Sequence, residues 1–191
     1  MRNKEDARVL KTKDKLFSAL QDLLSEKSFE NITVNEICIK ADVRRATFYK
    51  HFNDKYDFLA VMISSFIGRF DARMRNKYRS FPVEYHLEYE RQLIEFLLDN
   101  NDIVSSILES SMLSSVVMII VNEHYKVLME RLTNSVNSGE RLVADVSTVA
   151  TALSGGIGNI IVRWFAEGKP CSKEHLTKEM DNIVRAMFIN R

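Results

Sequence analysis

The stretch that decides the fold is residues 33–55, which read TVNEICIKADVRRATFYKHFNDK. Thr33 and Glu36 have the spacing of a capping box, in which each side chain accepts a hydrogen bond from the other residue's backbone N–H. The apolar residues that follow predict a short helix over about residues 34–40. A turn then leads into a second short helix, over about residues 45–51.

The second of these helices separates apolar from polar side chains. Phe48 and Phe52 are four residues apart and share one face, which we expect to pack inward. The other positions carry hydrogen-bond donors, namely Arg45, Thr47, Tyr49, Lys50 and His51. Donors on an outward face suit contact with the phosphates and base edges of DNA. A charged face that meets only solvent is the simpler alternative.

Two short helices cannot bury their own apolar sides, so a further helix has to cover them. A leucine stripe at helical spacing over residues 16–24 predicts that helix. The three together form a helix-turn-helix module of the kind that binds DNA. Residues 53–54, Asn-Asp, are typical of the start of the next helix. We therefore expect a DNA-binding domain over residues 1–54 and a C-terminal domain over residues 55–191.

Positive charge is concentrated in the first of these domains. Residues 40–55 hold five basic and two acidic residues, and residues 1–15 hold six basic and three acidic residues, a net charge of +3 in each case. The whole chain of 191 residues carries only +1. A local basic surface favours contact with a polyanion such as DNA.

The rest of the sequence is also helical in pattern. Apolar residues recur every three or four positions in five segments, over residues 59–70, 83–98, 103–134, 142–164 and 176–188. We expect a bend near Ser110 and a cap at Ser172. Two prolines and six glycines are too few for the turns of a β-sandwich or barrel. The predicted class is all-α, with about nine helices.

Residues 33–37 and 41–55 resemble the DNA-binding signature of the TetR/AcrR family of bacterial transcriptional regulators, above all in the Thr-Phe-Tyr-x-His-Phe core at residues 47–52. The resemblance covers residues from about 10 to 60. It implies a homodimer that places one recognition helix of each subunit in the major groove of a palindromic double-stranded operator. Carried over position by position, it implies DNA contacts by Thr33, Asn35, Arg44, Arg45, Thr47, Tyr49, Lys50, His51 and Lys55.

Arg44 departs from the pattern of that family. Many members have Ser or Thr at this position, where the side chain caps the recognition helix, and arginine cannot cap in that way. Two alternatives follow: Asp42 supplies the cap, or Arg44 reaches the DNA backbone.

The C-terminal half also resembles a subgroup of the family that includes regulators similar to the dihydroxyacetone-kinase activator. This resemblance is carried by the Gly-Gly-Ile-Gly run at residues 155–158, Trp164, Gly168 and the last helix. The family resemblance implies a dimer interface on the last two long helices, formed by Leu153, Ile157, Ile161, Trp164, Met180, Ile183 and Met187. The glycines favour a close helix crossing, with a kink as the alternative.

Methionine and aromatic residues on the middle helices are candidates for lining an effector pocket. They are Phe66, Phe70, Tyr89, Met112, Met118 and Tyr125. Ordinary core packing is the alternative for each. The C-terminal domain is therefore expected either to bind a small hydrophobic or amphipathic effector, or to dock a protein partner.

Other function classes find little support. The four histidines and two cysteines lack metal-ligand spacing, and no nucleophile elbow or phosphate-binding loop is present. We expect no cofactor, no metal and no catalytic residue, with an all-helical enzyme or carrier as the remaining alternative. The most apolar stretch, residues 103–121, has an uninterrupted apolar core of only six residues, 116–121, which is too short to span a membrane. We expect a cytoplasmic repressor without a membrane partner.

Overall fold

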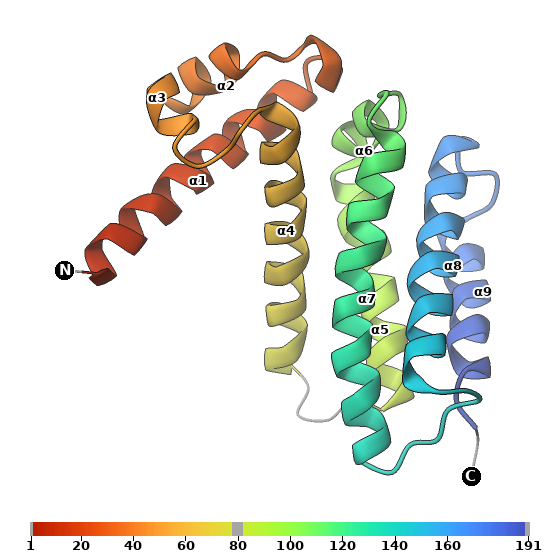
Figure 1. Cartoon of the computed structure of the whole chain (residues 1–191). Coiled ribbons are helices and arrows are strands. Elements are labelled where there is room, and N and C mark those ends of the chain that lie inside the picture. The colour runs from red at the N-terminus through yellow and green to blue at the C-terminus, as the bar shows by residue number, and fades with distance from the viewer. Residues whose placement is uncertain (1, 78–81, 190–191) are drawn as a thin grey trace. The chain divides into compact units, whose positions relative to one another are not determined.

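The structure is a computed structural model that describes the backbone of residues 2–77 and 82–189 and the side chains of residues 9–74 and 82–189. Over these residues the predicted all-α class is confirmed, with nine α-helices and one 3₁₀ turn (Figure 1). The elements are α1 (Arg2–Leu24), the turn η1 (Phe29–Asn31), α2 (Val34–Ala41), α3 (Arg45–Phe48), α4 (Lys55–Lys77), α5 (Val83–Asp99), α6 (Asn101–Leu108), α7 (Leu113–Asn137), α8 (Val146–Ala166) and α9 (Lys173–Ala186).

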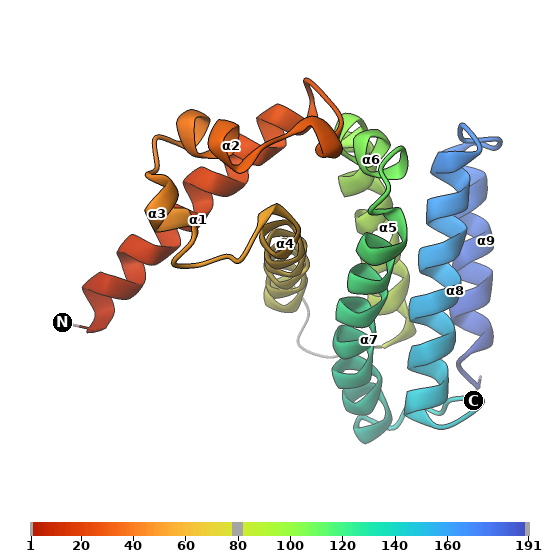
Figure 2. The same ribbon diagram turned by 45° about the horizontal axis from the view of Figure 1, so that its top comes forward.

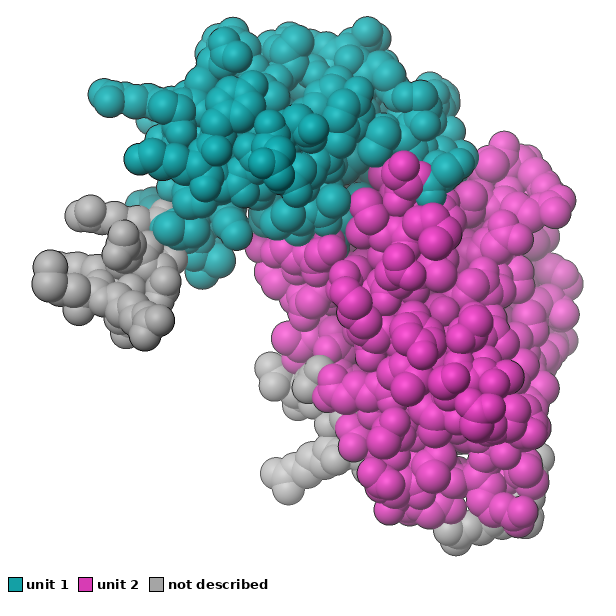
Figure 3. Space-filling model, in the orientation of Figure 1, with its two compact units in different colours: residues 1–63, 102–114 teal, residues 64–101, 115–191 magenta. Residues whose placement is uncertain are grey.

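The chain forms two compact units (Figure 3). Unit 1 comprises residues 1–63 and 102–114, and unit 2 comprises residues 64–101 and 115–191. α4 therefore begins in unit 1 and continues into unit 2. The domain division after residue 54 stays a prediction, because a compact group of residues does not show that either part folds alone.

The core of unit 1 is aromatic. Phe48 and Phe52 are 0% and 2% exposed, as their shared face predicts, and their ring centroids lie 5.3 and 4.7 Å from that of Phe58. Phe17 of α1 stacks on the same Phe58 ring at 5.5 Å. Burial of each such ring contributes about 1.5–3 kcal/mol. This cluster therefore joins α1, α3 and α4, which lets a four-residue helix hold its place.

Helix ends differ from the predictions at three points, two of them in α3 and between α6 and α7. α3 has four residues, Arg45–Phe48, where residues up to 51 were expected to be helical. A turn follows it, in which Tyr49 keeps right-handed helical dihedral angles and the backbone N–H of Phe52 donates to the carbonyl of Phe48 at 3.0 Å. The bend expected near Ser110 is a complete break, since residues 109–112 separate α6 from α7. The caps fall where the sequence predicts them: the Ser172 side chain accepts the backbone N–H of His175 at 3.2 Å.

The segment before α8 pairs with the end of the chain instead of extending the helix. Leu142 and Phe188 form an isolated antiparallel bridge. The backbone N–H of Val143 donates to the carbonyl of Met187 at 3.0 Å. α8 starts only at Val146, so the predicted helical stripe from residue 142 begins one turn too early.

In unit 2, helices α5, α7, α8 and α9 lie side by side in both ribbon views (Figures 1 and 2). α9 is joined to α5 by three ion pairs, Lys173–Glu95, Asp181–Arg91 and Arg185–Glu84. Among the described helices, α8 is long and apolar enough to cross a membrane by length and composition. A core helix meets the same criterion, and eight residues of α8 are buried within this chain.

Candidate nucleic-acid interface

α2 begins at the predicted capping box. Thr33 Oγ1 accepts the backbone N–H of Glu36 at 3.2 Å, and Glu36 Oε2 accepts the backbone N–H of Thr33 at 2.9 Å. The ammonium group of Lys27 donates to the other carboxylate oxygen. This bond first, and then those from Thr33, lower the pKa of Glu36 to about 2. The helix start is thereby fixed, with Thr33 and Asn35 exposed beside free backbone N–H groups.

The turn between α2 and α3 depends on a left-handed residue. Asp42 has a φ of 53°, and its backbone N–H donates to the carbonyls of Cys38 and Ile39. Val43 N–H donates to the carbonyl of Cys38 at 2.9 Å. Aspartate tolerates this conformation better than most residues other than glycine and asparagine. The tight reversal therefore sets the direction of α3 without a glycine.

α3 and the turn after it present polar side chains to solvent. Arg45, Tyr49 and Lys50 are exposed, whereas Phe48 between them is fully buried. The guanidinium carbon of Arg45 lies 5.9 Å from the centroid of the Tyr49 ring. Such a contact restricts the orientations open to the arginine. The division into inward rings and outward donors thus agrees with the sequence.

Neither Arg44 nor Asp42 caps the start of α3. Arg44 occupies the N-cap position with extended backbone, and its side chain makes no capping hydrogen bond. Asp42 does not supply the cap, because its carboxylate is 98% exposed and faces Lys15 at 3.7 Å. Arg44 is exposed. The alternative that survives is contact between Arg44 and a DNA backbone, which stays a prediction.

Lys55 corrects the list of expected DNA contacts. Its Nζ donates to three backbone carbonyls around η1, those of Phe29, Glu30 and Ile32, at 3.0, 2.9 and 2.9 Å. An ammonium group has three donors, so none remains for a phosphate. Partial burial lowers the pKa of Lys55. This lysine holds η1 against the start of α4, and we remove it from the contact set.

The other residues that were expected to contact DNA have accessible side chains. Thr33, Asn35, Arg44, Arg45, Tyr49 and Lys50 are exposed, and Thr47 and His51 are half-buried. They come from the start of α2, from α3 and from the turn that follows it. Their role in DNA binding is not tested by these positions and stays a prediction.

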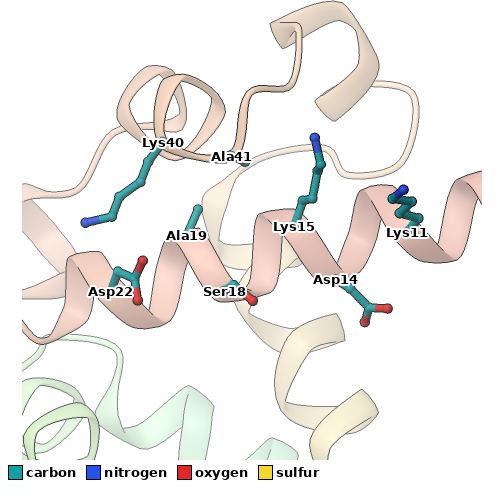
Figure 4. A pocket seen from close by; sticks show the side chains of 8 residues that line it. All are labelled: Lys11, Asp14, Lys15, Ser18, Ala19, Asp22, Lys40 and Ala41. Atoms are coloured by element: carbon teal, nitrogen blue, oxygen red, sulfur yellow. The ribbon is translucent and has the colours of Figure 1, made fainter.

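A surface hollow of about 460 Å³ lies between α1 and α2 (Figure 4). Its lining residues are Lys11, Asp14, Lys15, Ser18, Ala19, Asp22, Lys40 and Ala41. Lys40 is already paired with Glu26 at 2.6 Å, and Lys15 with Asp42 at 3.7 Å. Because its cations stand among carboxylates, we assign the hollow no part in binding DNA.

The expected effector residues do not form one group. Phe70 packs edge-to-face on Tyr89, with 5.0 Å between ring centroids, and Phe66 lies 6.2 Å from Phe96. Tyr125 is half-buried in α7. Two positions depart from the expectation, since Met112 belongs to unit 1 and Met118 is 57% exposed.

The expected dimer residues are mostly core residues of the chain itself. Leu153, Ile157, Ile161, Trp164 and Met180 are between 1% and 5% exposed. Ile183 and Met187 are half-buried. A side chain enclosed by its own chain has no surface left for a partner. The apolar stripe thus marks the inward face of α8 and α9, and an interface on these helices has to use another face.

Sequence reasoning missed a cluster of polar side chains buried in unit 2. Arg131 of α7 is 1% exposed and forms an ion pair with Asp71 of α4. His86 Nε2 lies 3.2 Å from Ser135 Oγ, and burial lowers the pKa of His86 to about 3. The available signal was a set of polar residues at inward helical positions, which interrupt the apolar stripes of α4, α5 and α7.

Comparison with known proteins identifies the N-terminal module. Residues 16–62 match the family described as bacterial regulatory proteins, tetR family. An HTH-type transcriptional regulator of Bacillus subtilis strain 168, YxbF, is 34% identical over 94 residues. That match covers 49% of this chain but 24% of YxbF, and a match to a Staphylococcus aureus regulator covers 55% of that protein. The chain thus spans about a quarter to a half of the length of these curated relatives.

Solved structures share the fold over nearly the whole chain. The Bacillus subtilis transcriptional regulator FadR, in complex with stearoyl-CoA, has a TM-score of 0.68 at 20% identity, covering 89% of this chain and 96% of FadR. The dihydroxyacetone kinase operon activator DhaS has a TM-score of 0.66 at 17% identity, covering 92% and 94%. At such identities the likeness shows the fold alone, so the resemblance to the DhaS subgroup stays a prediction.

Proposed function

The module at residues 16–62 belongs to the TetR family of regulators, and from this premise we propose that the chain is a dimeric, sequence-specific DNA-binding repressor whose operator affinity responds to a small effector. The observation that carries the proposal is the geometry of α3. Phe48 anchors the helix in the core, while Arg45 of α3 and Lys50 of the turn that follows it are exposed to solvent. Such a helix suits a major groove, where arginine and lysine contact guanine edges or phosphates.

Dimerisation is supported by the outward face of α8. Thr148, Ala152 and Gly156 are exposed at four-residue spacing. A Cβ atom at Gly155 or Gly156 would meet nothing within 4 Å, so packing inside the chain does not require glycine there. Each helical glycine costs about 1 kcal/mol relative to alanine. Close approach of a second copy would account for this cost, and it supports an interface on this face over one on the buried stripe.

Effector control is supported by the aromatic and polar interior of unit 2, where Phe70, Tyr89 and His124 lie in ring contact. A ligand there changes operator affinity only if it binds the DNA-competent and incompetent conformers unequally. The competing proposal is a protein partner docked on the C-terminal half. It is favoured by Met118, which is 57% exposed within the apolar start of α7.

The test is selection of bound sequences from random duplex DNA, followed by titration of the selected operator at fixed salt. Arg45→Ala and Lys50→Ala should each weaken binding by about 1–3 kcal/mol if the side chain reads a base, and relax the sequence preference. Lys126→Ala, on the exposed face of α7, is the matched control and should leave affinity unchanged. Unchanged affinity of both the Arg45→Ala and the Lys50→Ala variant would show that the docking face is wrongly assigned.

A further inference from the structure

Glu90 of α5 is a buried carboxylate with an unused oxygen. Its side chain is 4% exposed, and Oε1 lies 3.2 Å from Nε2 of His124 on α7. That contact is within ion-pair distance but does not have hydrogen-bond geometry. Neither Glu90 Oε2 nor His124 Nε2 has a hydrogen-bond partner among the described residues. A buried carboxylate in this state is costly unless a donor reaches it.

Aromatic rings lie next to this carboxylate. The His124 ring stacks on Tyr89, with 5.6 Å between centroids and 10° between planes. Phe70 of α4 packs edge-to-face on Tyr89 at 5.0 Å. The faces of such rings carry negative charge density and attract cations. Three helices thus bring one anionic group and an aromatic wall to the same place.

The other ionisable groups of the region have partners or charge states of their own. Asp71 and Arg131 form an ion pair of their own. Burial, and then the charges of His124 and Arg131, lower the pKa of His86 to about 3, so that this ring is neutral near pH 7. Burial and the nearby carboxylates keep the Tyr89 hydroxyl protonated by raising its pKa well above the usual value. His124 is therefore the basic group that faces Glu90, and it leaves Oε2 unused.

We propose that Glu90, with the rings of Tyr89 and Phe70, is the recognition point for an organic cation, a protonated amine on an aromatic or aliphatic body. This inference rests on the proposed function, in which that ligand is the effector. The ammonium group donates to Oε2 and contacts the ring faces, while the apolar body replaces core contacts between α4, α5 and α7. Carboxylates and phosphate esters, including acyl-CoA compounds, are disfavoured because they bring a second negative charge to Glu90.

The experiment compares ligands that differ only in charge. Phenyl, naphthyl and biphenyl bodies, each as the aminomethyl, hydroxymethyl and carboxylate compound, are titrated against the full chain without DNA by calorimetry and by thermal shift. For at least one body, the amine should bind about tenfold or more tightly than both partners. Glu90→Gln, which keeps the shape and an acceptor oxygen, should abolish this preference.

Glu95→Gln is the matched control. It removes a carboxylate from the same helix, but at an exposed position paired with Lys173, and should leave the amine preference intact. Phe70→Leu gives an independent variant should Glu90→Gln fail to fold, and it should weaken the amine severalfold more than the alcohol.

Two results would overturn the inference: no amine binds more tightly than its alcohol, which leaves a buried water as the donor, or Glu90→Gln binds amines as the parent does. Operator binding is measured separately. Amine binding without operator binding would overturn the proposed function and keep this site, whereas operator binding without amine preference would do the reverse.

Discussion

At the scale of single residues, Lys27, Thr33 and Glu36 form one hydrogen-bonded unit that fixes the start of α2. Each partner satisfies a group that would otherwise be open at a helix terminus. The cap was visible in the sequence, because its spacing is local. The contribution of Lys27 was not, since it comes from nine residues away and depends on how the chain turns at η1.

This hydrogen-bonded unit predicts that the folded chain loses stability at acid pH. The pKa of Glu36 falls from the ordinary 4.5 to about 2 in the folded chain, so the stabilisation is complete above pH 4.5 and is lost as the pH falls toward 2. Glu36→Gln should therefore lower stability near neutral pH and flatten the decline over that window. Urea unfolding at a series of pH values measures it. An identical pH dependence in the variant would show that the carboxylate is not held in this way.

At the scale of elements, the sequence predicted the helix starts that depend on a local cap. It did not predict the features that depend on packing between elements. Asp54 caps α4 by accepting the backbone N–H groups of Tyr56 and Asp57, as the sequence suggests. Phe52, beyond the end of α3, packs on the ring of Phe58 in α4, a contact between elements that no local pattern records. The buried polar cluster was missed for the same reason, since only the fold shows which polar positions face inward.

Lys55 joins the start of α4 to η1. Its replacement should lower the stability of the chain without changing its contacts with DNA. Lys55→Met keeps the apolar stem but removes the donor to three carbonyls of the η1 region, so unfolding free energy should fall by about 1–3 kcal/mol. The salt dependence of operator binding by the folded variant should not change. Lys50→Met should do the opposite, with little change in stability and a salt slope reduced by about one. A reduced salt slope in Lys55→Met would return this lysine to the contact set.

At the scale of the whole molecule, the proposed function depends on a surface that one chain cannot complete. In the proposed dimer, two copies of α3 are held at the spacing of successive major grooves, about 34–36 Å. The sequence pattern pointed to α8 and α9 for this task, but the stripe it picked out is mostly buried within the chain itself. An apolar stripe predicts that one face of a helix is buried. It does not indicate whether the residues that cover this face belong to the same chain or to a second one. Exposed small residues, without an internal reason to be small, are the better indication of a partner.

The proposed interface predicts that Gly156→Leu separates folding from assembly. Nothing in the chain lies within 4 Å of a Cβ at this position, so the leucine fits the monomer and removes the roughly 1 kcal/mol cost of a helical glycine. Across an interface of close-packed small residues it should clash, and weaken the dimer by about tenfold or more, near 1.4 kcal/mol. Sedimentation velocity over a concentration series measures the change.

Gly68→Leu on α4 is the matched control. Gly68 is also exposed and helical with nothing within 4 Å of its Cβ, so it gains the same helix propensity without touching the α8 face. It should leave the dimer unchanged. The assembled chain should also bind a palindromic operator more tightly than a half-site, and Gly156→Leu should lose that advantage while keeping half-site affinity. A dimer that survives Gly156→Leu at full strength places the interface elsewhere, because a leucine side chain cannot fit where two helix backbones meet closely.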